Sequence, residues 1–245
     1  MRIAFLTGAG MSAESGVPTF RDALTGLWAR FDAERLATET AFRDDPALVW
    51  GWYRWRAALV RSAAPNAGHA GIAALAPYHD VAVITQNVDD LHERAGSREV
   101  AHLHGSLFAS RCIDCGAVEH GGDEDPILRD ATAVPDGGGR EEPPRCGHCG
   151  GAIRPGVVWF GEALPETAWT AAVQAIEGCE LLVVIGTSGL VHPAAALPGL
   201  AREAGKRIIE INPQRSAVTP LVDEHFACGA GEGLARLAAC LPQKP

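Results

Sequence analysis

Four short apolar runs, rich in β-branched residues, constrain the fold of this chain more than any other feature of its sequence. They lie at 3–7, 81–85, 181–185 and 207–211, and each ends at a loop signal. Runs of this length and composition are typical of strands buried in a parallel sheet. Helical patterns occur between them, near 69–76, 88–94, 166–177 and 194–204. The alternation predicts an α/β fold with a doubly wound parallel sheet.

Two stretches interrupt this alternation. The stretch 25–63 is rich in Trp and Arg and has a helical pattern, and the stretch 111–152 holds two C-x-x-C pairs. Three further cysteines, at positions 179, 228 and 240, are expected to be buried small hydrophobic residues. The chain therefore combines an α/β domain with a second, smaller module.

The charge of the chain is concentrated in one segment. The formal net charge is −9, and the segment 119–142 carries −6 of it through eight acidic residues against Arg129 and Arg140. The remainder is close to neutral, so no basic stripe indicates direct nucleic-acid binding. We expect the biased segment 121–144 to form a mobile, solvated loop.

The apolar runs are too short for a membrane or a secretory signal. The longest, such as 181–185, span about five residues, whereas a bilayer-spanning helix needs about twenty. The first apolar run ends at Thr7, too early for the apolar region of a signal peptide. We expect no membrane association and a cytoplasmic location.

A glycine-rich loop follows the first run. Residues 8–13 read G-A-G-M-S-A and match G-x-G-x-x-A, with Ser12 and Glu14 resembling a helix start. Small residues there allow backbone N–H groups to approach a pyrophosphate, although a simple tight turn has the same composition. A dehydrogenase would also need a second strand ending in an acid about twenty residues further on. Asp32 and Glu34 lie at about that distance but in helical surroundings, which disfavours an ordinary dehydrogenase.

The two cysteine pairs indicate a metal site. They are Cys112 with Cys115 and Cys146 with Cys149, and adjacent glycines suit tight turns around a metal. Four thiolates suit tetrahedral zinc and leave no ligand position for a catalytic water. We therefore expect one structural zinc per chain, with a redox dithiol as the alternative.

Small or polar residues follow three of the apolar runs. They are Gln86, Asn87 and Asp89 after the second run, Gly186, Thr187 and Ser188 after the third, and Asn212 after the fourth. Open α/β sheets bind ligands at this edge, although Asn and Asp at strand ends also serve as helix caps. His102 and His104 share one face of an extended segment, where a structural role is the alternative to catalysis.

Together these motifs resemble a known family. The stretches GAGMSAESGVPTFRD, TQNVDDLH, HLHGS, VVWFGE, GTS and IEINP, with the two cysteine pairs, occur in the order typical of sirtuins, the NAD-dependent protein-lysine deacylases. The resemblance covers residues 3 to about 235. It implies a Rossmann-like NAD-binding domain formed by 1–24, 64–110 and 153–245. The helical module 25–63 and the zinc-binding module 111–152 would form the small domain, with acyl-lysine bound in the cleft between the domains.

The resemblance also implies roles for individual residues. It assigns the phosphates of NAD to Gly8, Ala9, Gly10 and Ser12, the cofactor loop to Phe20, Arg21 and Asp22, the nicotinamide ribose and carboxamide to Gln86, Asn87 and Asp89, and the adenosine half to Gly186, Thr187, Ser188 and Asn212, with Gly229 and Ala230 as adenine contacts. His104 would be the general base. The segment of Val158, Trp159, Phe160, Gly161 and Glu162 would pair with the substrate backbone by strand addition.

The helical pattern 47–61 adds an observation about the substrate. At 100° per residue, with Leu48 at 0°, Arg56 falls at about 80°, inside the apolar arc, and Tyr53 falls at about 140°. A buried guanidinium needs an anionic partner, so Arg56 holds a ligand, forms an internal ion pair or extends its head group to water. Y-x-x-R at this place resembles the sirtuin class that removes succinyl, malonyl or glutaryl groups, where the pair holds the distal carboxylate.

The chemistry implied by the resemblance consumes NAD. The amide oxygen of an acyl-lysine peptide or protein attacks the anomeric carbon of the nicotinamide ribose and expels nicotinamide. His104 then deprotonates a ribose hydroxyl, which accepts the acyl group and gives O-acyl-ADP-ribose and free lysine. An NAD-linked oxidoreductase, a zinc-ribbon binding module and a side activity as an ADP-ribosyltransferase are the alternatives.

Overall fold

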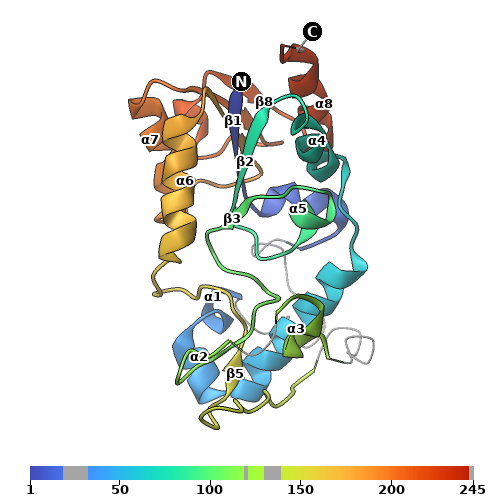
Figure 1. Cartoon of the computed structure of the whole chain (residues 1–245), viewed down its shortest axis with the longest axis vertical. Coiled ribbons are helices and arrows are strands. Elements are labelled where there is room, and N and C mark those ends of the chain that lie inside the picture. Colours follow the sequence, from blue (N-terminus) through green and yellow to red (C-terminus); the bar gives the residue numbers. More distant parts are fainter. Residues whose placement is uncertain (19–32, 119–120, 130–138, 243–245) are drawn as a thin grey trace. The chain divides into compact units, whose positions relative to one another are not determined.

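The computed structural model describes residues 1–18, 33–118, 121–129 and 139–242 (Figure 1). The chain divides into two compact units. Unit 1 comprises Met1–Thr19, Ala64–Leu103 and Pro165–Pro245, and unit 2 comprises Phe20–Ala63 and His104–Leu164. Unit 2 therefore includes residues 104–110 and 153–164, which the sequence analysis places with the NAD-binding domain.

Unit 1 is built on a six-stranded parallel sheet. Its strand order is β3-β2-β1-β6-β7-β8, with the strands β1 Arg2–Thr7, β2 Asp80–Thr85, β3 Val100–His102, β6 Leu181–Ile185, β7 Arg207–Ile211 and β8 Glu224–Phe226. The order reverses direction between β1 and β6, as in doubly wound folds. The four predicted strands are confirmed, together with the predicted fold class.

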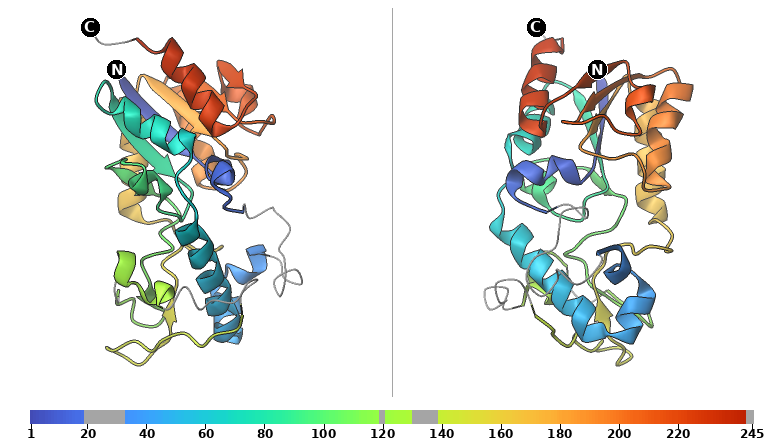
Figure 2. Two further views of the ribbon diagram at one scale, coloured as in Figure 1. Left: turned by 90° about the vertical axis from the view of Figure 1, so that its right-hand side faces the viewer. Right: turned by 180° about the vertical axis from the view of Figure 1, so that it is seen from behind.

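Helices cover both faces of this sheet. They are α4 Ala67–Leu75, α5 Leu91–Arg94, α6 Glu166–Gly178, α7 Leu197–Glu203 and α8 Ala230–Cys240. Figures 1 and 2 show α4 and α8 side by side on one face, and α6 and α7 on the other. The three-layer arrangement explains why both faces of the central strands are apolar.

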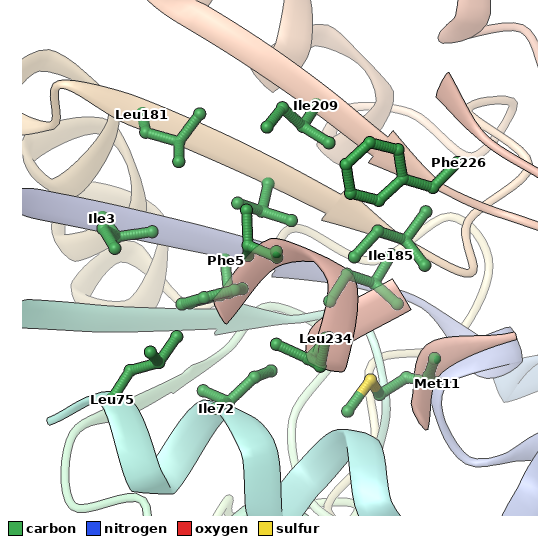
Figure 3. Packing of buried hydrophobic residues seen from close by; sticks show 14 of the residues in the cluster. Ile3, Phe5, Met11, Ile72, Leu75, Leu181, Ile185, Ile209, Phe226 and Leu234 are labelled. Carbon is green, nitrogen blue, oxygen red and sulfur yellow. The ribbon is translucent and has the colours of Figure 1, made fainter. Parts of the chain in front are cut away.

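A hydrophobic cluster fills the space between the sheet and the α4–α8 layer. Phe5 of β1 and Val183 of β6 are fully buried, and Ile72 of α4 and Leu234 of α8 pack toward them (Figure 3). Each such side chain contributes roughly 1.5–3 kcal/mol when it leaves water. The cluster anchors the strands whose carboxyl ends carry the candidate site.

The described part of unit 2 contains three α-helices and a small antiparallel pair of strands. The elements are α1 Ala33–Leu36, α2 Glu39–Asp44, α3 Pro46–Ser62, β4 Arg111–Cys112 and β5 Ile153–Arg154. Asp45 caps α3 by accepting from the Leu48 N–H over 3.1 Å, and Pro46 occupies the first turn. The helical character expected for this part of the chain is confirmed for 33–62.

The acidic segment is not solvated throughout. Asp125 is 1% exposed, and both its carboxylate oxygens accept from Ser110, at 2.5 Å from the backbone N–H and 2.5 Å from the hydroxyl. Pro126 and Ile127 are buried beside it. The expectation of a solvated loop is therefore wrong for 125–127, because the Asp125 carboxylate has its hydrogen-bond donors inside the unit.

The three cysteines outside the two C-x-x-C pairs differ in exposure. Cys179 and Cys228 are buried as expected, whereas Cys240 at the end of α8 is exposed, so that expectation is wrong there.

Among the described residues, no helix combines the length and the apolar character needed to cross a membrane.

Candidate active site and metal centre

The carboxyl ends of the central strands bring three loops to one level of the sheet. Thr7 of β1 lies beside Thr85 of β2 and Ile185 of β6. The Gly8 N–H donates to the Ile185 carbonyl over 2.9 Å, and the Gln86 N–H donates to the Thr7 carbonyl over 2.9 Å. The loops that begin at these positions therefore meet at the point where the strand order reverses, which is where open α/β sheets bind ligands.

Three of the predicted side chains meet there. The Gln86 amide donates to the Thr187 hydroxyl over 3.0 Å, and the Asn212 amide donates to the Thr187 carbonyl over 3.0 Å. These groups come from the ends of β2, β6 and β7. The sequence predicts that they share one edge of the sheet, and the structure brings them into direct contact within unit 1.

The glycines of this edge are required by the close approach of two backbones. A Cβ atom at Gly10 would lie 2.7 Å from the Cα of Gly186, and one at Gly8 would lie 2.9 Å from the Gly186 carbonyl oxygen. Gly186 itself has a φ of 62°, which disfavours any side chain. Gly8 and Gly10 therefore serve the packing of the β1 loop on the β6 loop, a role that the phosphate interpretation alone does not include.

Ser12 belongs to a buried polar network. Its hydroxyl donates to Asp89 Oδ2 over 2.8 Å and accepts from the Asn87 amide over 3.1 Å. Burial raises the pKa of the Asp89 carboxyl, although the bonds from Ser12 and from the Leu91 N–H oppose that shift. The loop forms two short 3₁₀ helices, Ala9–Met11 and Ala13–Ser15, and Ser12 is the N-cap residue of the second, so the predicted helix start is a 3₁₀ helix whose cap position receives no side-chain hydrogen bond. The Ser12 hydroxyl bonds across the unit instead.

The start of α8 lies against the same loop. Gly229 caps α8 and Ala230 begins it, and the Gly231 N–H donates to Glu14 Oε2 over 3.2 Å. The carboxylate of Glu14 complements the positive end of the helix dipole. Sequence reasoning did not give Glu14 this role, because no local signal connects it to a helix 217 residues away. Phe20, Arg21 and Asp22, predicted to form the cofactor loop, lie outside the described residues.

The two neighbouring histidines have different environments. His102 lies near Asn87 O at 3.1 Å through Nδ1 and near Glu93 Oε1 at 2.6 Å through Nε2. Burial alone would lower the pKa of His102, but the carboxylate of Glu93 and the Asn87 carbonyl raise it overall. Both ring nitrogens of His102 are thus engaged, which suits a structural role.

His104 begins the segment that faces the predicted substrate strand. Its carbonyl accepts from the Val158 N–H over 2.8 Å, and Gly105 pairs with Val157. Gly105 has a φ of 72°, and a Cβ there would lie 2.3 Å from the Gly156 carbonyl oxygen. The H-G pair therefore joins His104 to the segment 157–162 within unit 2.

An internal ion pair shapes the segment 157–162. The guanidinium of Arg154, 3% exposed, bonds to the carboxylate of Glu162 and donates to the Val157 carbonyl over 2.8 Å. Glu162 Oε2 also accepts from the Trp159 N–H over 2.8 Å, and the Phe160 N–H donates to the Ala37 carbonyl over 2.9 Å. The Glu162 side chain therefore holds the loop together from inside, and Phe160 is the large apolar side chain that the loop exposes.

Tyr53 and Arg56 are both buried on α3. Tyr53 is 1% exposed and Arg56 is 8% exposed, so the guanidinium does not extend to water as one alternative required. The Tyr53 hydroxyl accepts from Trp159 Nε1 over 3.1 Å, and the Arg56 Cζ lies 5.3 Å from the centre of the Trp52 ring. Burial raises the pKa of Tyr53 against the opposing charge of Arg56, so the phenol stays neutral and can donate.

The four paired cysteines converge in unit 2. The Sγ atoms of Cys112, Cys115, Cys146 and Cys149 all lie within 4.8 Å of one another. In each C-x-x-C pair the carbonyl of the first cysteine accepts from a glycine N–H. Cys112 accepts from Gly116 over 3.1 Å, and Cys146 accepts from Gly150 over 2.9 Å. Such matched turns point four thiolates at one point, which suits tetrahedral zinc and leaves no ligand position for water. The site is therefore structural.

Replacement of one zinc ligand tests this site. We expect Cys112→Ser to lower the metal content from about one zinc per chain to a small fraction of that, and to lower the melting temperature, because structural metal binding is coupled to folding. Metal analysis of the purified protein together with thermal unfolding measures both. A Cys240→Ser variant, which alters an exposed cysteine outside the cluster, should keep its zinc. A zinc-free wild-type preparation that is fully folded would contradict the assignment.

The fold and these sites define a class of protein, a nucleotide-binding α/β domain with an inserted four-thiolate module. The profile of the Sir2 family matches residues 8–193, and the chain belongs to that family. The chain is 55% identical over 241 residues to NAD-dependent protein deacylase 1 of Pseudomonas aeruginosa, covering 96% of this chain and 92% of that protein.

Solved structures agree with this membership. A Sir2 homologue in complex with NAD is 44% identical and superposes with a TM-score of 0.86, covering 97% of this chain and 88% of that one. A mutant Sir2 homologue in complex with 2′-O-acetyl-ADP-ribose is 42% identical with a TM-score of 0.84, covering 99% and 94%.

Proposed function

We propose that this chain is an NAD-dependent protein-lysine deacylase that removes succinyl and malonyl groups as well as acetyl groups. Membership of the Sir2 family and the deacylase name of its relative support the reaction class. The homologues bound to NAD and to an acetyl ester of ADP-ribose support NAD as the co-substrate and O-acyl-ADP-ribose as the product. NAD is then consumed and no hydride moves.

The observation that carries the acyl preference is the environment of the Tyr53 phenol. An indole N–H can only donate, so the Tyr53 oxygen is the acceptor in its bond to Trp159 and its own proton is left to donate elsewhere. Within the described part of the chain, no group accepts that proton. A buried donor without an acceptor costs roughly 1–3 kcal/mol, so the site suits a ligand that supplies one.

The positive charge of Arg56 favours a negatively charged acceptor for the Tyr53 proton. Its guanidinium lies close enough to oppose the rise in the pKa of Tyr53, and it is buried beside the Trp52 ring. A carboxylate at the end of an acyl chain could accept from both side chains and would place a negative charge beside the guanidinium. An acetyl group has no carboxylate and leaves the Tyr53 proton without this acceptor.

His104 would supply the proton transfer. In this proposal its imidazole takes the proton from a ribose hydroxyl, so that the hydroxyl oxygen can accept the acyl carbon. The segment 157–162 would hold the substrate backbone, with its shape set by Arg154 and Glu162. The zinc site takes no part in these steps and stabilises unit 2.

The acyl preference is tested with matched peptides. Succinyl-lysine and acetyl-lysine peptides of one sequence are hydrolysed separately at saturating NAD, and kcat/KM is measured for each. The charge-assisted contacts predict that the succinyl peptide is faster by about tenfold or more. An acetyl peptide that reacts as fast as the succinyl peptide would contradict the preference and leave the reaction class intact.

A further inference from the structure

The side chain of Trp159 is packed inside unit 2. It is 1% exposed, its ring lies 5.4 Å from that of Phe42, and the Arg154 Cζ lies 3.3 Å from its centre. Its N–H groups are both used: the backbone N–H donates to Glu162 and the indole N–H donates to Tyr53. The indole is therefore held at its face, its backbone and its edge inside unit 2.

This fixed indole determines where the Tyr53 proton points. A phenol O–H rotates between two orientations in the plane of its ring, and a neutral phenol can donate or accept. The indole donor occupies one lone pair of the Tyr53 oxygen at 3.1 Å, so the proton is directed away from Trp159. The donor that the acyl carboxylate would meet is thus oriented before the substrate binds, which reduces the entropy lost on binding.

We propose that Trp159 is a specificity-positioning residue, which selects acyl groups with a distal carboxylate by orienting the Tyr53 hydroxyl. The inference rests on the proposed function, because it assumes that Tyr53 meets that carboxylate. Trp159 acts through Tyr53 and does not touch the acyl group. Its effect must therefore disappear when the Tyr53 hydroxyl is removed.

The test is a double-mutant cycle on substrate preference. Trp159→Phe keeps an aromatic ring over Arg154 but removes the indole N–H. We expect it to lower the ratio of kcat/KM for succinyl-lysine over acetyl-lysine by about three- to tenfold, the range of one hydrogen bond. In a Tyr53→Phe background the same change should leave the ratio within about twofold, because no hydroxyl remains to be oriented.

A matched tryptophan provides the control. Trp50 lies on α3, the helix that carries Tyr53, and its side chain is 0% exposed. Its indole N–H has no hydrogen-bond partner among the described residues. Trp50→Phe should lower stability by a comparable amount and leave the ratio unchanged. General damage to the fold cancels in the ratio, since it affects both substrates alike.

The possible outcomes separate the two proposals. The positioning role would be overturned if Trp159→Phe lowered the ratio of kcat/KM values equally with and without the Tyr53 hydroxyl. It would also be overturned if Trp159→Phe left this ratio unchanged while Tyr53→Phe lowered it. If Tyr53→Phe and Arg56→Met both left the ratio unchanged, the carboxylate preference itself would fail, and the positioning role would fail with it.

Discussion

Replacing His104 with Ala is expected to lower kcat for deacylation by about two to four powers of ten. A positioned general base contributes a factor of this size because it takes the proton as the new bond forms. The backbone of His104 would keep its bond to Val158, since that contact uses the carbonyl oxygen. Binding of NAD, measured by calorimetry, should therefore change little while turnover collapses.

His102→Ala is the control for this prediction. Its ring nitrogens bond to Asn87 and Glu93, so its loss should disturb the local network and reduce turnover far less than His104→Ala. Steady-state rates for the two variants on one acyl peptide decide between the histidines. Equal and small losses in both would show that neither is the base.

Replacing Arg56 with Met is expected to lower kcat/KM for a succinyl-lysine peptide by about one to two powers of ten. The Met side chain keeps the apolar packing against the Trp52 ring but removes the charge. A charge-assisted hydrogen bond contributes roughly 1.5–3 kcal/mol, which corresponds to that loss in rate. Acetyl-lysine has no carboxylate and loses no contact with Arg56, so its kcat/KM should stay unchanged or rise as the pocket becomes less polar.

Tyr53→Phe should shift the preference in the same direction but less, because it removes one neutral donor. The informative quantity in every variant is the ratio of kcat/KM values for the two peptides, measured with the same enzyme preparation. Parallel losses on both peptides in Arg56→Met would identify Arg56 as part of an internal ion pair. The acidic-acyl preference would then be wrong.

Strands and helices with strong local patterns could be predicted from the sequence. The four runs that became β1, β2, β6 and β7 are short segments rich in apolar and β-branched residues, and the Trp-rich stretch gave α3. The strands β3 and β8 were missed because three residues carry too little pattern. The helix α8 was missed because its sequence, AGEGLARLAAC, contains two glycines, which disfavour a helix, although Leu234 and Leu237 lie on one buried face.

The site was predictable only where its residues follow strand ends or form spaced motifs. The spacing of the two cysteine pairs predicted the metal site in unit 2, and the order of the strands predicted that Gln86, Thr187 and Asn212 share one edge of the sheet in unit 1. The bonds from Trp159 to Tyr53 and from Ser12 to Asp89 join residues 106 and 77 positions apart, and nothing local in the sequence encodes them. The role of the loop glycines in backbone packing was likewise visible only once β1 and β6 were neighbours.

Mass spectrometry of the products is the direct test of NAD-dependent deacylation by this chain. The enzyme is mixed with NAD and equimolar acetyl-, succinyl-, malonyl- and glutaryl-lysine peptides of one sequence, and absorbance at the NADH band is followed in parallel. We expect one nicotinamide and one O-acyl-ADP-ribose for each lysine freed, with the succinyl and malonyl peptides consumed before the acetyl peptide and no NADH formed. Formation of NADH with the peptides left intact, or release of free acyl acid while NAD is not consumed, would contradict it.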